Sequence, residues 1–472
     1  MVVAQGVLPF KVELIHAGET VTAHGALPLV VEALRRLVSQ DDYRVLAAAL
    51  GYASLTPVRR HLESLVALVV AGGEHLDDLE VLRSDAGLAA LLGFPLSSPT
   101  QAKDFLYRFH QGADGHPLTE ADDAALSVRG TATIRPEGPG LTALATVVGQ
   151  GVAAVQQTRP VSTATLDVDA TLVEAHKEGA LKAYEGTVGY QPQMAYWAEA
   201  GVWVADEFRD GNVPAALGAK AFLEHAFGAL PAGIFCRQLR ADTAFYDEAA
   251  LTWADAEGIG FAVSADMSPA LAYEIASLPE AAWQSYRGRE ARAADREERQ
   301  WAEVVFVPNW ARNHQKHGHA FRYLAIRVRS RQAELFEEEP VWRHFAVVTN
   351  QEGDGEAILR WQRGKQGTVE HGHGVVKNDL GGGVLPCGRF GANAAWWRLN
   401  ALAHNLLTFL QAGALPPALA KARPKTLRFR LFNVAGRVVR HARGWILKLS
   451  AHLPWAEAFV HARRWLAAWA PS

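Results

Sequence analysis

The sequence contains little cysteine and no long apolar run. Its 472 residues include 2 cysteines, Cys236 and Cys387, which lie far apart. This excludes a disulfide framework and a cysteine-based zinc site, and it favours a reducing compartment. No apolar stretch reaches the roughly 18 residues needed to cross a bilayer, and the segment after Met1 lacks the basic start and cleavage site of a signal peptide. We therefore expect a cytoplasmic protein with no membrane partner.

Acidic residues are missing from one long stretch, residues 380–456. The net charge of the chain is −3 and this stretch carries 11 basic residues, so the rest must sum to about −14, since −3 minus 11 is −14. A surface that meets phosphates explains this asymmetry better than a solvated face of mixed sign, so the stretch predicts nucleic-acid binding. The basic residues are Arg389, Arg398, Lys421, Arg423, Lys425, Arg428, Arg430, Arg437, Arg440, Arg443 and Lys448.

The first part of the chain is predicted to be helical. The content of 49% hydrophobic and 21% charged residues is typical of a globular protein, and the length predicts about two to four units. Within residues 26–110, apolar residues recur every three to four positions, and Ser98 followed by Pro99 is a helix start signal. Residues 111–140 are rich in Gly, Pro and Asp, which predicts a connection. The segment "LTALATVVGQGVAAVQQ" then predicts a further helix.

The periodicity changes at "TATLDVDATLVEA". Leu166, Val168 and Ala170 alternate with Asp167 and Asp169, which predicts a strand. The segments that follow, as far as "GFAVSAD", predict two more strands and then helix, strand, helix and strand. This order predicts an α/β fold with a mixed sheet.

A β-rich segment and further helices complete the chain. "EERQWAEVVFVPN", "HAFRYLAIRVRSR" and "VWRHFAVVTN" each predict a strand, and together they predict an inserted β unit of roughly 80 residues before the helix that carries Glu370. "ANAAWWRLNALAHNLLTFLQ" predicts a very apolar helix. "FNVAGRVVRHARGWILKLS" and "WAEAFVHARRWLAAW" predict basic amphipathic helices at the C-terminal end.

Three acids on separate elements are candidates for a metal site. Asp169 lies on a strand whose other face is apolar, Asp242 ends a second strand, and Glu370 lies on a later helix. Oxygen ligands without nearby cysteine suit hard divalent cations. Two such ions about 3.5–4 Å apart can activate the attacking oxygen and stabilise the leaving one in phosphoryl transfer. Lys377, seven residues after Glu370 on one helix face, is then a candidate to hold a phosphate.

Other readings of these residues stay open. Asp167 is on the same face as Asp169 and competes with it as the first ligand, and an isolated strand aspartate is usually a cap or an ion-pair partner. Gly372 and Gly374 each cost a helix about 1 kcal/mol relative to Ala. The spacing "HQKHGH" completes no closed zinc site, so five histidines are predicted to be surface residues. They are His314, His317, His319, His371 and His373.

Several segments together resemble bacterial insertion-sequence transposases of the DDE type with a Tyr-Arg-Glu-Lys signature, most closely their thirteen-eighty family. "GGEHLDDLEVLRSDAGLAALLG" is similar to the N-terminal region of that family, and "LDVDATLVEAH" to its first-acid segment, which places the first acid at Asp169. "GTVGYQP" and "EFRDGNVPA" resemble the segments that follow. "LRADTAFYD" resembles the second-acid motif at Asp242, and "VEHGHGVVKNDLGGGVLPCGRFGANAAWW" the third-acid segment with Glu370 and Lys377.

The sequence departs from this signature at two positions. Counting back from Glu370, the signature arginine falls on Gln366 and the signature tyrosine on Arg363. The resemblance implies that these positions contact DNA phosphates near the cut end. Arg363 and Lys365 are therefore candidates to supply the missing charge, and Trp361 to supply an aromatic ring.

The resemblance implies a ribonuclease H-like mixed sheet core, interrupted by a β-rich insertion, with helical N- and C-terminal regions. It implies cleavage at transposon ends and strand transfer into target DNA, with two Mg²⁺ ions (or Mn²⁺) held by the three acids. The expected partners are terminal inverted repeats, target DNA and a second copy in a synaptic homodimer, in a bacterial, nucleoid-associated setting. The expected parts are an N-terminal DNA-binding region 1–110, a connection 111–160, the core 161–266 and 351–412, the insertion 267–350 and a basic helical region 413–472.

Two alternative functions stay open at this point. An inactive or domesticated transposase would keep the basic stretch and bind DNA without metal-dependent cleavage. A ribonuclease H-like nuclease would cut DNA without joining it to a target. A third reading, a zinc hydrolase that uses the histidines, is disfavoured by their spacing.

Overall fold

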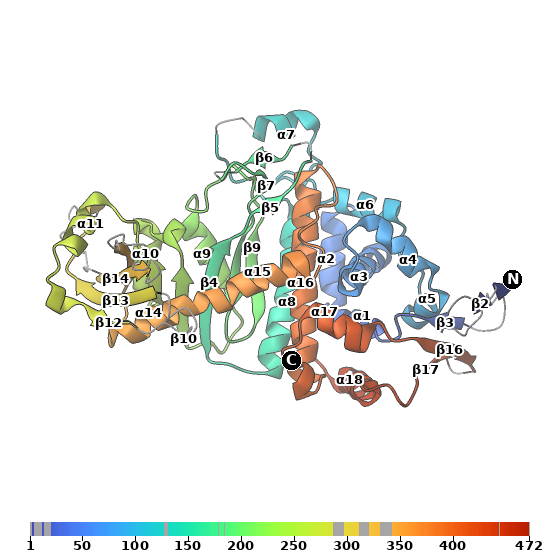
Figure 1. Ribbon diagram of the computed structural model, residues 1–472. Coiled ribbons are helices and arrows are strands. Elements are labelled where there is room, and N and C mark those ends of the chain that lie inside the picture. The colour runs from blue at the N-terminus through green and yellow to red at the C-terminus, as the bar shows by residue number, and fades with distance from the viewer. Residues whose placement is uncertain are drawn as a thin grey trace.

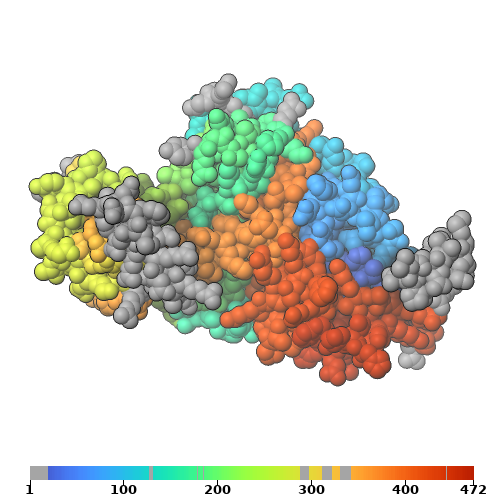
Figure 2. Space-filling view, in the orientation of Figure 1, coloured from blue at the N-terminus to red at the C-terminus, as the bar shows by residue number. Residues whose placement is uncertain are grey.

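A computed structural model describes residues 2–3, 12–13, 20–126, 131–177, 179–183, 185–286, 297–310, 321–330, 342–442 and 444–471. Figure 1 shows a β-rich part at one end, a sheet crossed by helices in the middle and a helical part at the other end. In Figure 2 the N-terminal helices (blue) lie beside the C-terminal segments (red). Within the described residues, no helix has the length and apolar character needed to cross a membrane.

The N-terminal part is helical, as predicted. Ser98 caps one helix by accepting a hydrogen bond from the backbone N–H of Gln101, and Pro99 holds the first helical position. Buried Glu63 joins two other helices through a 2.7 Å contact with Arg35. The elements of this part are β1 (Val2–Val3), β2 (Val12–Glu13), α1 (Pro28–Leu37), α2 (Gln40–Ala49), α3 (Leu55–Ala71), α4 (Leu79–Ser84), α5 (Ala86–Leu92), α6 (Pro99–Tyr107) and α7 (Glu120–Leu126).

A nine-stranded sheet, ordered β12-β13-β14-β15-β11-β10-β4-β8-β9, forms the middle of the chain. Strand β4 is parallel to β10 and β10 to β11, whereas β8 and β9 follow β4 as antiparallel neighbours. The predicted mixed α/β class is confirmed. Leu166 and Asp167 point to opposite faces of β4 and both are fully buried, so both faces are covered. The strands on this side are β4 (Thr163–Ala170), β8 (Gln193–Trp197), β9 (Val202–Glu207), β10 (Cys236–Ala241) and β11 (Gly260–Ser264).

The predicted β insertion continues this sheet. Strand β15 pairs antiparallel with β11, β14 with β15 and β13 with β14, so the insertion extends the edge of the sheet. Apolar side chains fix its place, because Trp301, Leu324 and Val347 pack against Leu359 of the following helix in one buried cluster. The strands of the insertion are β12 (Gln284–Ser285), β13 (Glu297–Val304), β14 (Arg322–Ser330) and β15 (Arg343–Thr349).

Helices connect the sheet with the N-terminal part. Nearly every residue of α16 is buried, and this helix packs on α8, α3 and β9. Helices α14 and α15 cross the sheet in Figure 1, where α14 contacts β11 and β13 while α15 contacts β4 and β8. The remaining elements of the core are α8 (Pro139–Thr158), β5 (Val173–Glu174), β6 (Leu181–Lys182), β7 (Val188–Tyr190), α9 (Ala219–Gly228), α10 (Glu248–Ala256), α11 (Pro269–Ala276), α14 (Gly355–Arg363), α15 (Val369–Asn378) and α16 (Phe390–Gly413).

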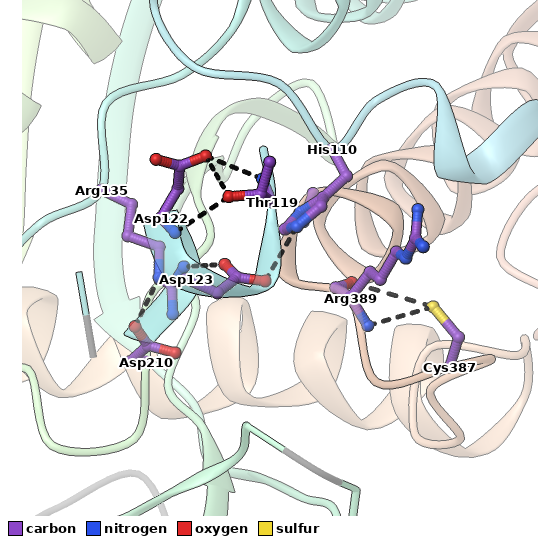
Figure 3. A network of polar contacts seen from close by, with 9 residues as sticks. His110, Thr119, Asp122, Asp123, Arg135, Asp210, Cys387 and Arg389 are labelled. Atoms are coloured by element: carbon purple, nitrogen blue, oxygen red, sulfur yellow. Dashed lines mark hydrogen bonds and ion pairs between the residues drawn. The ribbon is translucent and has the colours of Figure 1, made fainter. Parts of the chain in front are cut away.

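Ion pairs tie the predicted connection to the core (Figure 3). Arg135 donates from Nε to Asp210 Oδ2 at 2.7 Å and from Nη1 to Asp123 Oδ1 at 2.6 Å. His110 Nδ1 accepts a 3.2 Å hydrogen bond from the N–H of Gly391, so its Nε2 carries the proton and donates to Asp123 Oδ2 at 2.9 Å. The connection is thereby fixed beside α16.

The C-terminal region is not entirely helical. The prediction of an amphipathic helix over "FNVAGRVVRHARGWILKLS", the first of two in this region, is wrong. That segment forms a hairpin, β16 and β17, which takes β3 as a third strand. The β-branched pair Val438 and Val439 favours a strand, and Gly444 adopts a φ of 139° that other residues rarely adopt. The second predicted helix forms as α18. The elements are β3 (Thr20–Thr22), α17 (Pro424–Leu427), β16 (Gly436–His441), β17 (Gly444–Lys448) and α18 (Ala456–Ala468).

Candidate active site

Two acids meet at the carboxyl ends of the parallel strands β4 and β10. The register pairs Asp167 with Arg240. Two residues further along each strand come Asp169 and Asp242, so the parallel register brings their side chains to the same edge and the same face of the sheet. Asp242 directly follows β10, and its Oδ1 accepts a 3.1 Å hydrogen bond from the N–H of Ala244. The prediction that Asp242 ends a strand is confirmed.

Glu370 reaches this edge on helix α15, which packs closely on the sheet. A Cβ atom at position 372 would lie 2.7 Å from Cζ2 of Trp203, so Gly372 permits an approach that a side chain would block. This requirement outweighs the cost of about 1 kcal/mol that glycine adds to a helix. Glu370 is exposed, and its charge raises the pKa of Asp169. The predicted helix with both Glu370 and Lys377 is confirmed.

Asp169 is a largely buried acid with one lysine and two further acids close enough to affect its pKa. Burial raises the pKa of Asp169 to about 6, the ammonium of Lys365 opposes this rise, and the carboxylates of Asp242 and Glu370 add to it. The Lys365 Nζ atom lies 3.5 Å from Asp169 Oδ1, and the lysine side chain is 9% exposed. The charges of Asp242 and Glu370 therefore both act on Asp169, which also has one lysine beside it.

Asp167, the competing acid, is fully engaged by structural partners. Arg240 donates from Nε to Asp167 Oδ1 at 2.5 Å and from Nη2 to Oδ2 at 2.8 Å. The hydroxyl of Thr368 also donates to Asp167 Oδ2. Arg240 Nη1 donates to the carbonyl of Trp361 at 2.7 Å, and its guanidinium lies 5.4 Å from the centre of the Trp361 ring. Trp361 therefore packs on Arg240 and is partly buried.

Sequence reasoning missed Arg240 and Thr368, which decide between the two strand aspartates. A signal for Arg240 was present, since this residue stands two positions before Asp242 just as Asp167 stands two before Asp169. Parallel pairing of the two strands puts such positions side by side. For Thr368, 201 residues from Asp167 in the chain, we find no comparable signal in the sequence.

Lys377 holds the chain that follows the first acid. Its Nζ donates to the carbonyl of Leu172 at 2.7 Å and lies 3.4 Å from the hydroxyl of Thr171. Burial lowers the pKa of Lys377. A lysine on the helix of Glu370 thus fixes the loop after Asp169, and so it fixes two of the three acids relative to each other.

A groove leads from the acids to the insertion. It has a volume of about 630 Å³, and Asp242 and Glu370 are among its lining residues. Arg343 and Phe345 of β15 also line it; the Arg343 side chain is 64% exposed and the residue Phe345 is 48% exposed. Other lining residues are Asp266, Glu297, Arg299, Gln362, Arg363, Lys365 and Gln366. Positive and aromatic groups of the insertion therefore share one groove with two of the acids.

The three acids fit a divalent cation in chemistry and charge. They offer carboxylate oxygens, the ligands that Mg²⁺ and Mn²⁺ prefer. Burial is the main cause of the raised pKa of Asp169, and the charges of Asp242 and Glu370, which a cation would balance, add to it. In the described part of the chain, no group of three or more His, Cys, Asp or Glu side chains is already arranged to hold an ion. Binding an ion therefore requires these carboxylates to move closer together.

The histidines do not form a second metal site in the described residues. His371 is exposed, as predicted, but His373 is buried against Trp203 at 5.1 Å, so the prediction of a surface residue is wrong there. Burial lowers the pKa of His373 to about 3 and keeps its ring neutral. The other three, His314, His317 and His319, lie outside the described residues.

The acid-free stretch is partly structural. Arg398 is buried and donates to Asp206 at 2.7 Å and to Glu137 at 2.6 Å. Arg423 binds Asp379, the last acid before the stretch, at 2.8 Å. Lys425 lies 3.6 Å from the same carboxylate, and Arg428 donates to the Asp379 carbonyl. The hairpin also carries exposed basic side chains, at Arg437, Arg440 and Lys448, while Arg443 lies outside the described residues.

Comparison with known proteins gives one family. The family model described as "Transposase DDE domain group 1" matches residues 7–470. Among solved structures, the chain is similar to the piggyBac transposase synaptic complex with hairpin DNA, seen by cryo-electron microscopy, with a TM-score of 0.47 and 10% identity. That match covers 85% of this chain and 78% of the other. No curated protein matches the chain.

Proposed function

The chain belongs to the transposase DDE domain group 1 family, and from this premise we propose that it is a bacterial insertion-sequence transposase of the thirteen-eighty type. In this proposal it cuts DNA at the ends of its element and joins the freed 3′-hydroxyl to target DNA. The observation that carries the proposal is the meeting of Asp169, Asp242 and Glu370 from three separate elements at one sheet edge. Such convergence of acids whose charges interact is typical of a functional site.

We assign the catalytic core to a ribonuclease H-like fold. Support comes from the unit β9-β8-β4-β10-β11, in which an antiparallel meander of three strands is followed by two parallel strands. Asp169 lies near the end of β4, and Asp242 directly follows the neighbouring strand β10. The insertion separates β11 from the helix of Glu370 in sequence, and it returns the chain to β11 through β15.

Each acid acts through its position. Asp169, Asp242 and Glu370 would hold the divalent ions, with Mg²⁺ the expected ion and Mn²⁺ its substitute. Bound ions would supply Lewis acidity and an activated oxygen for phosphoryl transfer. Asp167 is left out of this set because Arg240 and Thr368 already occupy its oxygens.

We propose that DNA lies along the groove and the hairpin. Arg363 and Lys365 line the groove near Glu370 and would supply positive charge close to the cut phosphate. Lys377 would add charge with the part of its ammonium that does not bind the Leu172 loop. The N-terminal helices would recognise the terminal inverted repeats, and two copies would join in the synaptic complex.

The test of the proposed cleavage activity requires the DNA sequences that flank the gene. Inverted repeats that flank it would provide the substrate, and DNA carrying them should be cut by the protein in the presence of Mg²⁺. Glu370→Gln keeps the shape of the side chain but removes its charge, so it should bind the same DNA without cutting it. Cutting without joining to a second duplex would support a nuclease instead. Binding without metal-dependent cutting by the unaltered protein would support an inactive transposase.

The hairpin gives a separate test of DNA binding. Replacing Arg440 and Lys448 together with Ala should weaken binding to repeat DNA and random DNA alike, because phosphates carry no sequence information. The slope of log affinity against log salt should become shallower, by up to about 0.9 for each phosphate that the variant no longer binds. Lys220→Ala, at an exposed lysine paired with Glu224 on α9, serves as the control. A salt slope equal to that of the control would remove the hairpin from the DNA surface.

A further inference from the structure

Lys365 is placed where a cation would bind. It lies in the 3₁₀ turn Gly364–Gly367 between α14 and α15, and its side chain is 9% exposed. Its Nζ stands 3.5 Å from Asp169 Oδ1. Within the described ranges, this is the one ion pair that any of the three proposed ligands makes. An almost buried ammonium thus provides the nearby positive charge at the first acid.

The two neighbouring basic groups have other fixed partners. Arg240 is held by both oxygens of Asp167 and by the carbonyl of Trp361. Lys377 donates to the carbonyl of Leu172. Lys365, in contrast, has one long contact with Asp169, which is weak for a charge-assisted hydrogen bond. Such a contact can be exchanged at little cost.

We propose that Lys365 is a built-in counter-ion, which neutralises the acidic site when no metal is bound and is displaced by the first incoming divalent ion. This inference rests on the proposed function, since it assigns Asp169 as a metal ligand. An ammonium and a metal ion cannot both occupy the same side of one carboxylate oxygen, and their like charges repel. The lysine therefore competes with the ion, and the affinity of the site for metal is set partly by this competition.

The structure gives Lys365 room to move. The residue lines the groove of about 630 Å³ together with Arg363 and Gln366, and its stem of four carbons can rotate into that space. A Cβ atom at position 367 would have no heavy atom within 4 Å, so the turn itself is open on that side. Displacement of the ammonium would also free Asp169 to approach Asp242 and Glu370, which is the movement that ion binding requires.

The experiment measures metal binding without DNA and without turnover. Mn²⁺ is titrated into the full chain, and free Mn²⁺ is followed by electron paramagnetic resonance. Lys365→Gln should bind the first Mn²⁺ about tenfold more tightly than the unaltered protein, because the competing charge is gone. Lys365→Arg keeps the charge and should bind no more tightly than the unaltered protein. Arg343→Gln removes one charge from the same groove without a contact to Asp169, and it should change the affinity by less than about twofold.

Thermal unfolding gives a second readout. Without metal, Lys365→Gln leaves Asp169 without its ion-pair partner, so the midpoint of thermal unfolding should fall below that of the unaltered protein. Saturating Mn²⁺ should raise this midpoint by more than it raises that of the unaltered protein, because the ion replaces the missing charge. Circular dichroism at low temperature confirms that the variant is folded.

The outcomes separate this inference from the proposed function. Equal or weaker Mn²⁺ binding by Lys365→Gln, when the unaltered protein binds Mn²⁺ and Asp169→Asn does not, would overturn the counter-ion role and leave the metal site intact. Weaker binding would show that the lysine positions the acids instead. Failure of the unaltered protein to bind Mn²⁺, or equal binding by Asp169→Asn, would overturn the metal site itself and this inference with it.

Discussion

Asp167 and Asp169 stand two residues apart on β4 and face the same side of the sheet, yet their surroundings differ. Asp167 is fully buried and receives two hydrogen bonds from Arg240 and one from Thr368. Asp169 has one lysine at 3.5 Å and two acids whose charges raise its pKa. A buried acid with matched charge holds structure together, whereas one with unmatched charge favours the binding of a cation. The partners of each aspartate, rather than the residue type, therefore distinguish the structural acid Asp167 from the proposed metal ligand Asp169.

The largest effect that distinguishes the two aspartates is expected when Asp169, the proposed metal ligand, is removed. Asp169→Ala should lower metal-dependent cleavage at least about 10³-fold, because metal-ion stabilisation of the transition state is worth several kcal/mol. Circular dichroism and DNA affinity should stay close to those of the unaltered protein. Cleavage that survives in Asp169→Ala, but is lost in a folded Asp167→Asn variant, would exchange the roles of the two aspartates.

The opposite effect is expected at the scaffold acid. Asp167→Ala leaves the guanidinium of Arg240 buried without its counter-charge, so it should lower the free energy of unfolding by about 3–5 kcal/mol. Urea denaturation in the absence of metal measures this loss, with Asp169→Ala as the matched control. The double variant Asp167→Leu with Arg240→Met should be more stable than Asp167→Ala, since it removes both charges. Equal losses in the two single alanine variants would show that the environments are alike.

Much of the fold could be predicted from local sequence. Three elements form as predicted: the strand around Leu166, the helix capped by Ser98 and the apolar helix α16. The signal for each of them comes from neighbours within a few residues. The segment of β16 and β17 forms a hairpin instead of the predicted helix. Its basic and apolar residues are spaced in a way that is compatible with the helical period of 3.6 residues and with the strand period of 2 residues. Its partner β3 lies more than 400 residues earlier in the chain, so no local pattern could reveal the pairing.

The candidate site was less predictable than the fold. The positions of Asp169 and Asp242 at the ends of strands indicated that both are site residues. The choice between Asp167 and Asp169, however, depends on Arg240 and Thr368, which are distant from both in sequence. The same holds for the basic stretch. Arg398 is predicted as a surface charge, yet its acid partners lie about 190 and 260 residues away. Charge pairing over such separations is a property of the folded chain.

A pH titration sharpens the comparison further. The pKa of Asp169 is raised to about 6 from its ordinary 3.8, so the folded chain binds this proton more tightly than the unfolded chain. The unaltered protein should therefore lose stability as the pH rises from about 4 to about 7, by roughly 2–3 kcal/mol from this group. Asp169→Asn lacks this proton, so its stability advantage should grow over the same range in urea titrations without metal. Parallel stability curves for the two proteins would refute the raised pKa of Asp169.

The smallest expected effect tests whether the two environments are independent. Thr368 precedes the helix of Glu370 by one position, yet its hydroxyl donates to Asp167 and not to Asp169. Thr368→Val preserves the shape and removes one hydrogen bond to a charged group, so it should cost about 1.5–3 kcal/mol in unfolding free energy, and Thr368→Ser should restore most of it. Affinity for Mn²⁺ should stay within about twofold, because Asp169 keeps its partners. If Thr368→Val instead changed Mn²⁺ affinity tenfold at unchanged stability, Asp167 would be coupled to the metal site. The threonine would then act as a positioning residue between the two acids, and the division of β4 into scaffold and site would not hold.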